Sequence, residues 1–221
     1  MNPVRKIIKQ IKEIRNNLNT NVDGLSNGVK IGILGGTFNP IHNGHLIMAE
    51  YVRIEFGLSK VIFMPCNIPY HKKSLKLLPA YQRLDMVKTA IKGNKYFESS
   101  DIDIKRGGLT YSIDTLKHLK SVYPGKSSFY FIIGMDSLVE LPLWREIRTL
   151  AKLCRFIAVK RPGFNKIKVQ SFLLPRVLYS SSPFVDISSS EIRIRVKQKQ
   201  SIRYLVPDSI IEYIKKHLLF S

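Results

Sequence analysis

Two histidines three residues apart, His42 and His45, are the side chains in this sequence best suited to chemistry on a phosphate. They lie in the segment GGTFNPIHNGHL (residues 35–46), which directly follows a short apolar stretch. An imidazole can donate a hydrogen bond to a phosphate oxygen whose negative charge rises as the phosphorus is attacked. Glycines before the histidines allow the backbone to turn closely around a ligand. The spacing therefore indicates electrostatic stabilisation of a phosphoryl or nucleotidyl transfer.

The histidine pair falls at the expected start of a helix over residues 43–56. Side chains three positions apart lie on the same helix face. The first turn offers free N–H groups and the positive end of the helix dipole to an anion. Gly44 is expected to leave room for a phosphate. A lone histidine here would more often be a packing residue, so it is the pair after a Gly-Gly turn that favours a phosphate site.

A second anion-binding pattern lies far downstream, in the segment SSSEIR (residues 188–193). Arg193 comes four residues after Ser189 and so reaches the same end of the expected helix. Serine hydroxyls, backbone N–H groups and this guanidinium together suit the β- and γ-phosphates of a nucleotide. The same letters also form an ordinary capping box that needs no ligand. The pattern therefore gains its meaning from the histidine pair.

These motifs require a scaffold of alternating strands and helices. We expect strands at residues 29–34, 60–64, 97–104, 128–133 and 153–159, and helices at 43–56, 79–91, 112–119, 189–197 and 207–218. This alternation predicts an α/β fold, a Rossmann-like doubly wound parallel sheet with helices on both faces. Right-handed crossovers would bring the loops after the strands to one edge of the sheet.

The chain divides by pattern into a basic N-terminal extension, residues 1–28, and a single domain, residues 29–221. In the extension, Ile7, Ile11, Ile14 and Leu18 form one apolar stripe on a basic helix, and a turn-rich linker follows. The simpler interpretation is a helix that packs on the domain or frays. A helix that binds a membrane surface or a partner is the alternative.

The formal net charge of +20 raises the question of a polyanionic partner. The chain has 36 lysines and arginines against 16 acidic residues, but the excess is spread along the sequence. No basic stripe interleaved with aromatic residues, as single-strand binders need, is evident. We therefore expect no specific nucleic-acid partner and attribute most of the excess to compositional bias.

Cysteine usage and hydropathy indicate the compartment. Cys66 and Cys154 lie far apart without metal-ligand spacing, which favours reduced thiols over a disulfide or a zinc site. No apolar run approaches the roughly 20 residues of a membrane span. Basic residues interrupt the N-terminal segment, so no signal peptide is expected. The predicted location is the cytoplasm, and a homo-oligomer is left open.

With these motifs assembled, the chain resembles the nucleotidyltransferases that carry GxFxPxHxGH and SSxxIR signatures. Within them it is similar to the bacterial nicotinate-nucleotide adenylyltransferases. The resemblance covers about residues 29–218. It includes PCNIPYHK (65–72), LTYSIDTL (109–116), FIIGMDSL (131–138), Trp144, RPG (161–163) and YLVP (204–207).

The resemblance implies transfer of AMP from ATP to nicotinate mononucleotide, giving deamido-NAD and pyrophosphate. It implies Mg²⁺ that accompanies ATP and is not held by a dedicated protein site. The implied catalytic residues are His42, His45 and Arg193. The implied ATP-binding residues are Gly35, Gly36, Thr37, Phe38, Gly134, Asp136, Ser189, Ser190 and Arg193. The implied nicotinate mononucleotide-binding residues are Thr110, Tyr111, Ser112, Trp144, His71 and Lys72.

Backbone N–H groups at Tyr111 and Ser112, where a helix is expected to begin, would favour the carboxylate of nicotinate over an amide. Three alternatives stay open at this point. Two share the resemblance, namely a nicotinamide mononucleotide adenylyltransferase and a phosphopantetheine adenylyltransferase. A nucleic-acid-binding module of the same fold is a different class. A class I aminoacyl-tRNA synthetase is excluded, because it would need a longer chain and a KMSKS-like loop, and neither is present.

Overall fold

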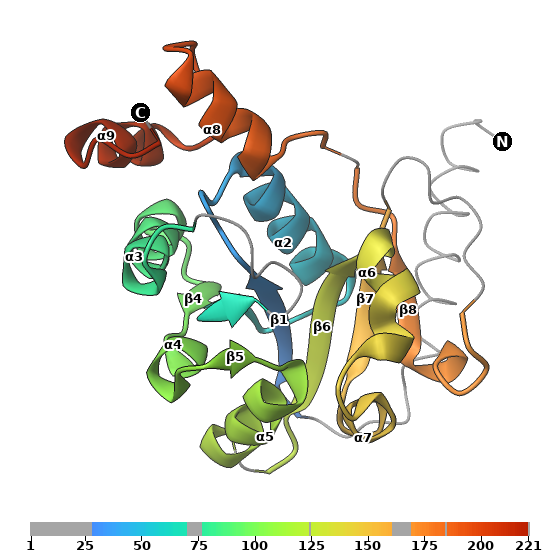
Figure 1. Cartoon of the computed structure of the whole chain (residues 1–221). Helices are drawn as coiled ribbons and strands as arrows, with labels where there is room; N and C mark the ends of the chain where they lie inside the picture. Colours follow the sequence, from blue (N-terminus) through green and yellow to red (C-terminus); the bar gives the residue numbers. More distant parts are fainter. Residues whose placement is uncertain (1–27, 70–76, 124, 161–168, 184, 221) are drawn as a thin grey trace, which may run out of the picture.

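A six-stranded parallel sheet forms the centre of the molecule (Figure 1). The computed structural model describes residues 28–69, 77–123, 125–160, 169–183 and 185–220. The strands lie in the order β4-β2-β1-β6-β7-β8, and every neighbouring pair is parallel. Their bounds are β1 Lys30–Gly36, β2 Lys60–Pro65, β4 Phe97–Ser99, β6 Ser128–Gly134, β7 Arg155–Val159 and β8 Val177–Ser180.

Helices cover both faces of this sheet, as the alternating pattern predicts. One face packs against α5 (Ser112–Val122), α6 (Met135–Glu140) and α7 (Ile147–Leu153). The other packs against α2 (Asn43–Glu55), α3 (Ala80–Ile91), α8 (Ser189–Lys197) and α9 (Asp208–Lys216). The doubly wound α/β architecture is therefore confirmed.

Successive side chains of a strand supply the two cores in turn. In β6, Phe129, Phe131 and Ile133 belong to the core under α5, α6 and α7. Tyr130 and Ile132 belong to the core on the opposite face. All five are buried, which accounts for the continuous apolar run in the sequence, because a parallel strand covered on both faces needs no polar side.

The expected strands and helices are present in the described residues with small shifts at their ends, with one exception. The expected strand over 97–104 is wrong beyond Ser99, because the chain turns into α4 (Ile102–Arg106). The apolar residues Ile102 and Ile104 alternate in the sequence as in a strand, but the buried residues of the helix are the neighbours Asp103 and Ile104. The predicted extension over residues 1–28 lies outside the described residues, except for Gly28.

Several short elements were not predicted. They are β3 (Ile68–Pro69), which pairs with β5 (Leu109–Thr110) in a separate two-stranded sheet, α6, α7, β8 and the 3₁₀ turns η1 (Leu141–Leu143) and η2 (Leu174–Arg176). The β3–β5 pair brings the segment after β2 beside the start of α5. Two hydrogen bonds add to it: Asn67 N–H donates to Thr110 Oγ1 at 3.0 Å, and Asn67 Nδ2 donates to the Gly108 carbonyl at 3.0 Å.

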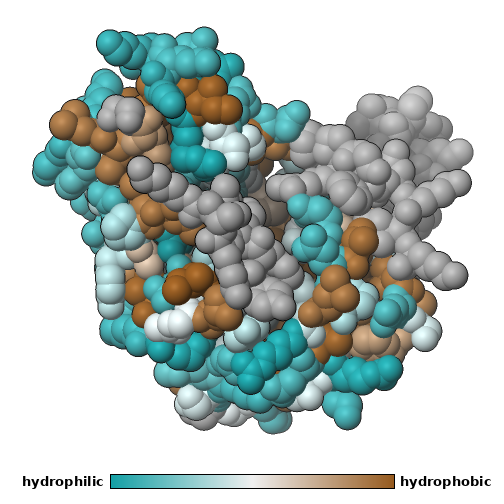
Figure 2. Space-filling view, viewed as in Figure 1, coloured by the Kyte–Doolittle hydropathy of each residue, from teal (hydrophilic) through white to brown (hydrophobic). Residues whose placement is uncertain are grey.

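The order of the strands marks where a ligand should bind. The chain leaves β1 toward β2 and β4 on one side, then returns to β6 on the other side of β1. A crevice forms at the carboxyl ends of the strands where the winding reverses in this way. Gly36 ends β1 and Gly134 ends β6. Figure 2 shows a face of the molecule that is mostly hydrophilic along its lower edge.

Candidate active site

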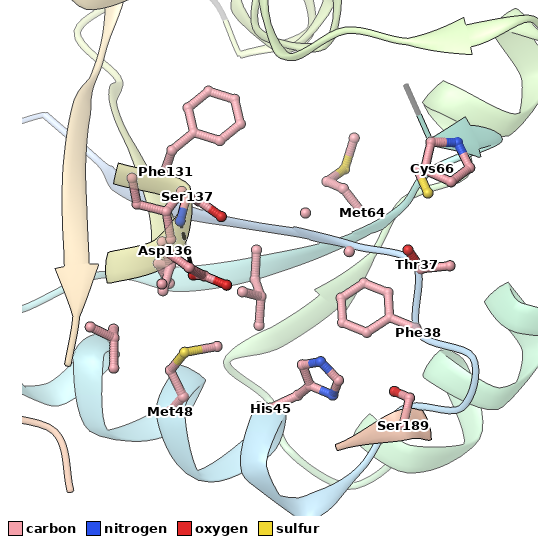
Figure 3. A pocket seen from close by; sticks show the side chains of 18 of the residues that line it. Thr37, Phe38, His45, Met48, Met64, Cys66, Phe131, Asp136, Ser137 and Ser189 are labelled. Carbon is pink, nitrogen blue, oxygen red and sulfur yellow. Dashed lines mark hydrogen bonds between the residues drawn. The ribbon is translucent and has the colours of Figure 1, made fainter. Parts of the chain in front are cut away.

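A cavity of about 820 Å³ opens at the carboxyl ends of β1 and β6. Its volume lies in the upper part of the range for small-molecule sites. Figure 3 shows its walls: α2 with His45 and Met48 on one side, Asp136 and Phe131 on another, and Cys66 and Ser189 at the far end. Every expected site residue that the structure describes lines it: Gly35, Gly36, Thr37, Phe38, His42, His45, Thr110, Tyr111, Ser112, Gly134, Asp136, Trp144, Ser189, Ser190 and Arg193.

The two histidines lie at the start of α2, as their spacing suggests. His42 is the N-cap residue and His45 the third residue of the helix. Their rings stack with centroids 3.6 Å apart and an interplanar angle of 28°. The ring of Phe38 packs edge-on against His45, with centroids 5.0 Å apart. Packing thus fixes both imidazoles, and only His42 is fully buried.

A backbone hydrogen bond assigns the proton on His45. The N–H of His42 donates to Nδ1 of His45 at 3.3 Å. An accepting Nδ1 carries a lone pair, so the neutral ring holds its proton on Nε2. The side chain projects from α2 into the cavity (Figure 3). His45 is therefore arranged to donate from Nε2 to an anion bound there.

The glycines of the motif serve different neighbours. A Cβ on Gly35 would meet nothing within 4 Å, so this position borders open space. A Cβ on Gly36 would lie 2.9 Å from the Phe38 ring. A Cβ on Gly44 would lie 3.1 Å from Nδ1 of His42. Gly44 was expected to make room for a phosphate, but its nearest neighbour is the His42 ring, so it gives space first to that imidazole.

The start of α8 is joined to the loop that carries His42. Ser189 Oγ donates to the Pro40 carbonyl at 2.8 Å. Arg193 Nη1 donates to the Asn39 carbonyl at 2.9 Å, and its Nη2 donates to Ser190 Oγ at 3.1 Å. An arginine has five N–H donors, so these two bonds leave others for a ligand. The start of α8 and the loop before α2, about 150 residues apart in the chain, thus form one polar wall of the cavity.

Ser188, which was not among the expected ligands, is the N-cap of α8 and also lines the cavity. Its hydroxyl accepts the N–H of Glu191 at 3.1 Å. The SSSE letters therefore do form a helix cap. The capping and the anion-binding interpretations are compatible, because different serines take part.

The start of α5 lines the cavity from the other face of the sheet. Tyr111 is the N-cap of α5, and Ser112 is its first residue. Trp144 follows η1 and is half-buried, with its ring edge-on to Phe131 and Phe156 at 6.4 Å. An aromatic wall beside a helix N-terminus suits a flat ring that carries an anionic group.

The two residues expected near an adenosine lie at the end of β6. Gly134 is the N-cap of α6, and Asp136 is in its first turn. Asp136 Oδ1 accepts the N–H of Ser137 at 2.9 Å, as the dashed line in Figure 3 marks. The remaining expected residues, His71 and Lys72, lie outside the described residues.

Three charged residues of the cavity wall were not predicted: Asp103, Arg145 and Lys160. Lys160 directly follows β7 and could have been found, because loops after parallel strands share one edge of the sheet. Arg145 is adjacent to Trp144 in the sequence. Asp103 gave no usable signal, since it was assigned to a strand.

Asp103 is a buried acid that connects α4 to α5. Its Oδ1 accepts from Thr115 Oγ1 at 2.6 Å and from Arg106 Nη2 at 2.7 Å. Burial raises the pKa of this carboxyl, while the bonds to Thr115 and Arg106 act in the opposite direction. Thr115 Oγ1 also lies 3.2 Å from the Tyr111 carbonyl. This group of contacts fixes the orientation of the start of α5.

Both cysteines are free and buried. Burial raises the pKa of the Cys66 thiol and raises that of Cys154 to about 12. A protonated thiol is a poor nucleophile. Cys66 lines the cavity but is therefore unsuited to forming a covalent intermediate, and the expectation of reduced thiols agrees with this structure.

The described residues offer no ready-made site for a resident metal ion. In the described part of the chain, no three His, Cys, Asp or Glu side chains gather closely enough to hold one. The two aspartates of the cavity, Asp103 and Asp136, both accept hydrogen bonds from protein donors. Within the same residues no helix has the length and apolar character to cross a membrane.

Comparison with known proteins adds two kinds of similarity. Residues 33–195 match the model of the cytidylyltransferase-like family. The chain is 45% identical over 198 residues to a probable nicotinate-nucleotide adenylyltransferase of Dehalococcoides mccartyi, covering 87% of this chain and 97% of the relative. It is 43% identical to a protein of the same name from Desulfitobacterium hafniense, covering 86% and 95%.

Among solved structures, the fold is similar to a Plasmodium falciparum nicotinic acid mononucleotide adenylyltransferase complexed with NaAD. The TM-score is 0.71 at 24% identity, and the match covers 87% of this chain and 97% of the other. The same enzyme complexed with APC gives a TM-score of 0.70. At this identity the likeness concerns the fold.

Proposed function

The chain belongs to the cytidylyltransferase-like family and, within it, to the nicotinate-nucleotide adenylyltransferases, and from this premise we propose that it transfers the AMP moiety of ATP to nicotinate mononucleotide. The products are deamido-NAD and pyrophosphate. The names of the relatives support the substrates, and the bound NaAD of the Plasmodium structure supports the product. The single structural observation that carries the proposal is the stacked histidine pair at the start of α2, in a cavity that the starts of α5, α6 and α8 also line.

The reaction is one displacement at phosphorus. A phosphate oxygen of the mononucleotide attacks the α-phosphorus of ATP, the new P–O bond forms, and the bond to the β-phosphate oxygen breaks. Pyrophosphate carries away the electron pair. The attacking phosphate is already an anion, so no side chain has to remove a proton. Catalysis then depends on positioning and on stabilising charge at the α-phosphate.

His45 is the main stabiliser of that charge. Its Nε2–H would donate to an equatorial oxygen of the α-phosphate, and the ring is held by the bond at Nδ1 and by Phe38. His42, stacked on it, contributes from the helix N-cap position. A donor that is already oriented needs no reorganisation as the transition state forms.

The triphosphate extends toward α8. Ser189, Ser190 and Arg193 offer hydroxyl and guanidinium donors beside the first turn of that helix. Gly35, Gly36, Thr37 and Phe38 line the path of the nucleotide along the end of β1, while Gly134 and Asp136 at the end of β6 receive the adenosine. Mg²⁺ would accompany ATP and offset the repulsion between its phosphates, and the residues that the structure describes contain no cluster of ligands to hold it apart from the nucleotide.

The mononucleotide lies at the α5 end of the cavity. Thr110, Tyr111 and Ser112 present the helix start to the nicotinate carboxylate, and Trp144 stacks on the pyridine ring. The segment with His71 and Lys72 remains a prediction for this subsite. The extension over 1–28 also remains a prediction as a separate part of the chain.

Product identification tests this proposal. The protein is incubated with Mg²⁺, ATP and nicotinate mononucleotide whose phosphate carries ¹⁸O. The products are then separated, and their isotope content is measured by mass spectrometry. We expect one labelled dinucleotide for each unlabelled pyrophosphate. Label in the pyrophosphate, or pyrophosphate formed without the dinucleotide, would contradict direct transfer between the two substrates.

A further inference from the structure

Arg83 is a charged side chain in the interior of the domain. It belongs to α3 and is only 1% exposed, one of the largest fully buried side chains in the described residues. Burying a cation is costly unless its donors are satisfied. The nature of its partners therefore indicates what this residue is for.

The partners of Arg83 are backbone carbonyls from three separate segments. Nη1 donates to Thr37 at 2.7 Å. Nη2 donates to Cys66 at 2.7 Å and to Asn67 at 2.9 Å. Nε donates to Leu78 at 3.0 Å. No carboxylate of the described residues pairs with it, and the one side chain among them that it hydrogen-bonds is the Cys66 thiol, at 3.9 Å.

These carbonyls belong to the framework of the cavity. Thr37 lies in the loop between β1 and α2, Cys66 and Asn67 follow β2, and Leu78 precedes α3. Thr37 and Cys66 line the cavity, whereas Arg83 does not. The guanidinium therefore acts from behind the wall, and any effect it has on a substrate passes through the backbone it holds.

The loop over residues 37–42 is held from a second side. Arg193 binds the Asn39 carbonyl, and Ser189 binds the Pro40 carbonyl. The side chain of Asn39 also accepts the N–H of Leu78 at 3.4 Å. The loop that ends at His42 is thus fixed by α3 at one end and by α8 at the other.

We propose that Arg83 is a positioning residue of the adenylyl transfer, which sets the loop between β1 and α2, and with it the histidine pair, against the end of β2. This inference rests on the proposed function. It assigns to a residue outside the cavity a share in the geometry on which charge stabilisation at the α-phosphate depends.

The chemistry requires arginine at this position. A guanidinium presents five N–H donors in a rigid planar fork, whereas the lysine ammonium presents three donors on one atom. Only the fork can reach carbonyls on three segments at once. Arg83→Lys keeps the charge and most of the volume but cannot keep all four bonds.

The first test is Arg83→Lys, assayed for kcat and KM with both substrates. We expect kcat to fall by about tenfold to a hundredfold, as a displacement near 1 Å can cause. Each KM should change less, because Arg193 and Ser189 still hold the loop. Arg53→Lys is the matched control. Arg53 is another helix arginine, with a side chain 16% exposed, but it binds Glu50 and Tyr96, away from the cavity, and its variant should keep kcat.

The second test is chemical rescue. Arg83→Ala leaves a space that free guanidinium can enter, and millimolar guanidinium should restore part of kcat, whereas methylammonium should not. A kcat for Arg83→Lys equal to that of the wild type would overturn the proposal. The proposal would also be overturned if the variant does not fold, or if it loses thermal stability together with kcat and guanidinium does not restore kcat. Arg83 would then serve the fold alone.

The proposed function and the positioning role of Arg83 would be contradicted by different results. If the wild type does not convert ATP and nicotinate mononucleotide, the proposed function fails, and Arg83 is not at issue. If the wild type is active and Arg83→Lys is equally active, the proposed function stands and the positioning role fails.

Discussion

At the scale of single residues, the proposed role of His45 depends on which of its ring nitrogens carries the proton. His45 accepts the backbone N–H of His42 at Nδ1, which leaves Nε2–H as its donor. The stacked His42 ring and the edge of Phe38 restrict rotation of the imidazole. The geometry therefore offers a single directed hydrogen bond, and removing it should affect the transition state more than the bound substrates.

His45→Ala tests this role. We expect kcat to fall by a factor of about 10² or more, as removal of one preorganised donor to an oxyanion does. His217→Ala is the matched control, because His217 is exposed at the end of α9, packed on Tyr213, and outside the cavity lining. Thermal unfolding of both variants checks the fold. A near-normal kcat for a folded His45→Ala protein would remove His45 from the mechanism.

Gly35 and Gly36 are adjacent but should respond differently to alanine. A Cβ at Gly35 enters open cavity space, so Gly35→Ala should fold normally and raise the KM for ATP. A Cβ at Gly36 would press on Phe38 at 2.9 Å, and overpacking of this kind typically costs about 1–3 kcal/mol of stability. Steady-state kinetics and thermal melts of both variants separate the effects. An unchanged KM for Gly35→Ala would mean that ATP does not pass this position.

At the scale of elements, the start of α5 and the turn after η1 together form the end of the cavity to which we assign the nicotinate carboxylate. Arg145 lies over the Tyr111 ring at 4.7 Å, and its Nη1 is 3.6 Å from Oδ2 of Asp114. Asp114 is the acid in the first turn of α5. Arg145 thus offsets a negative charge beside the helix start to which a carboxylate is assigned.

Arg145→Gln should therefore reduce the preference for the acid over the amide. Since Arg145 is about half exposed, solvent screens its charge, and we expect a modest loss of about threefold to tenfold in the ratio of the two kcat/KM values. Arg148→Gln, which removes a similar arginine packed on Phe172, is the control. Measuring both substrates with each variant decides the matter. An unchanged ratio in Arg145→Gln would show that Arg145 does not contribute to acid selectivity.

The elements that periodicity could predict were those with long apolar patterns. The strands β1, β2, β6 and β7 and the helices α2, α3, α5, α8 and α9 follow from local sequence, and so does the pairing of the HxGH and SSxxIR segments at one edge. The short α4 did not, because its apolar residues, Ile102 and Ile104, alternate in the sequence like those of a strand. The fixing of Arg83 to Thr37, 46 residues away, depends on tertiary contacts that leave no periodic trace.

At the scale of the whole molecule, the proposed substrates account for only part of the net charge of +20. Both substrates are small polyanions, and a positive protein attracts such ligands at a rate that falls with ionic strength. The cavity itself uses few cations: Arg145, Lys160 and Arg193 line it in the described part of the chain. Most of the charge is thus unexplained by the site.

The most direct test of the account is the rate of pyrophosphate release from ATP with nicotinate mononucleotide, compared with nicotinamide mononucleotide under the same conditions. The two acceptors differ only in the carboxylate or amide on the ring, so the comparison isolates the feature that the start of α5 is proposed to recognise. We predict a much higher kcat/KM with the acid. An equal or higher value with the amide would contradict it.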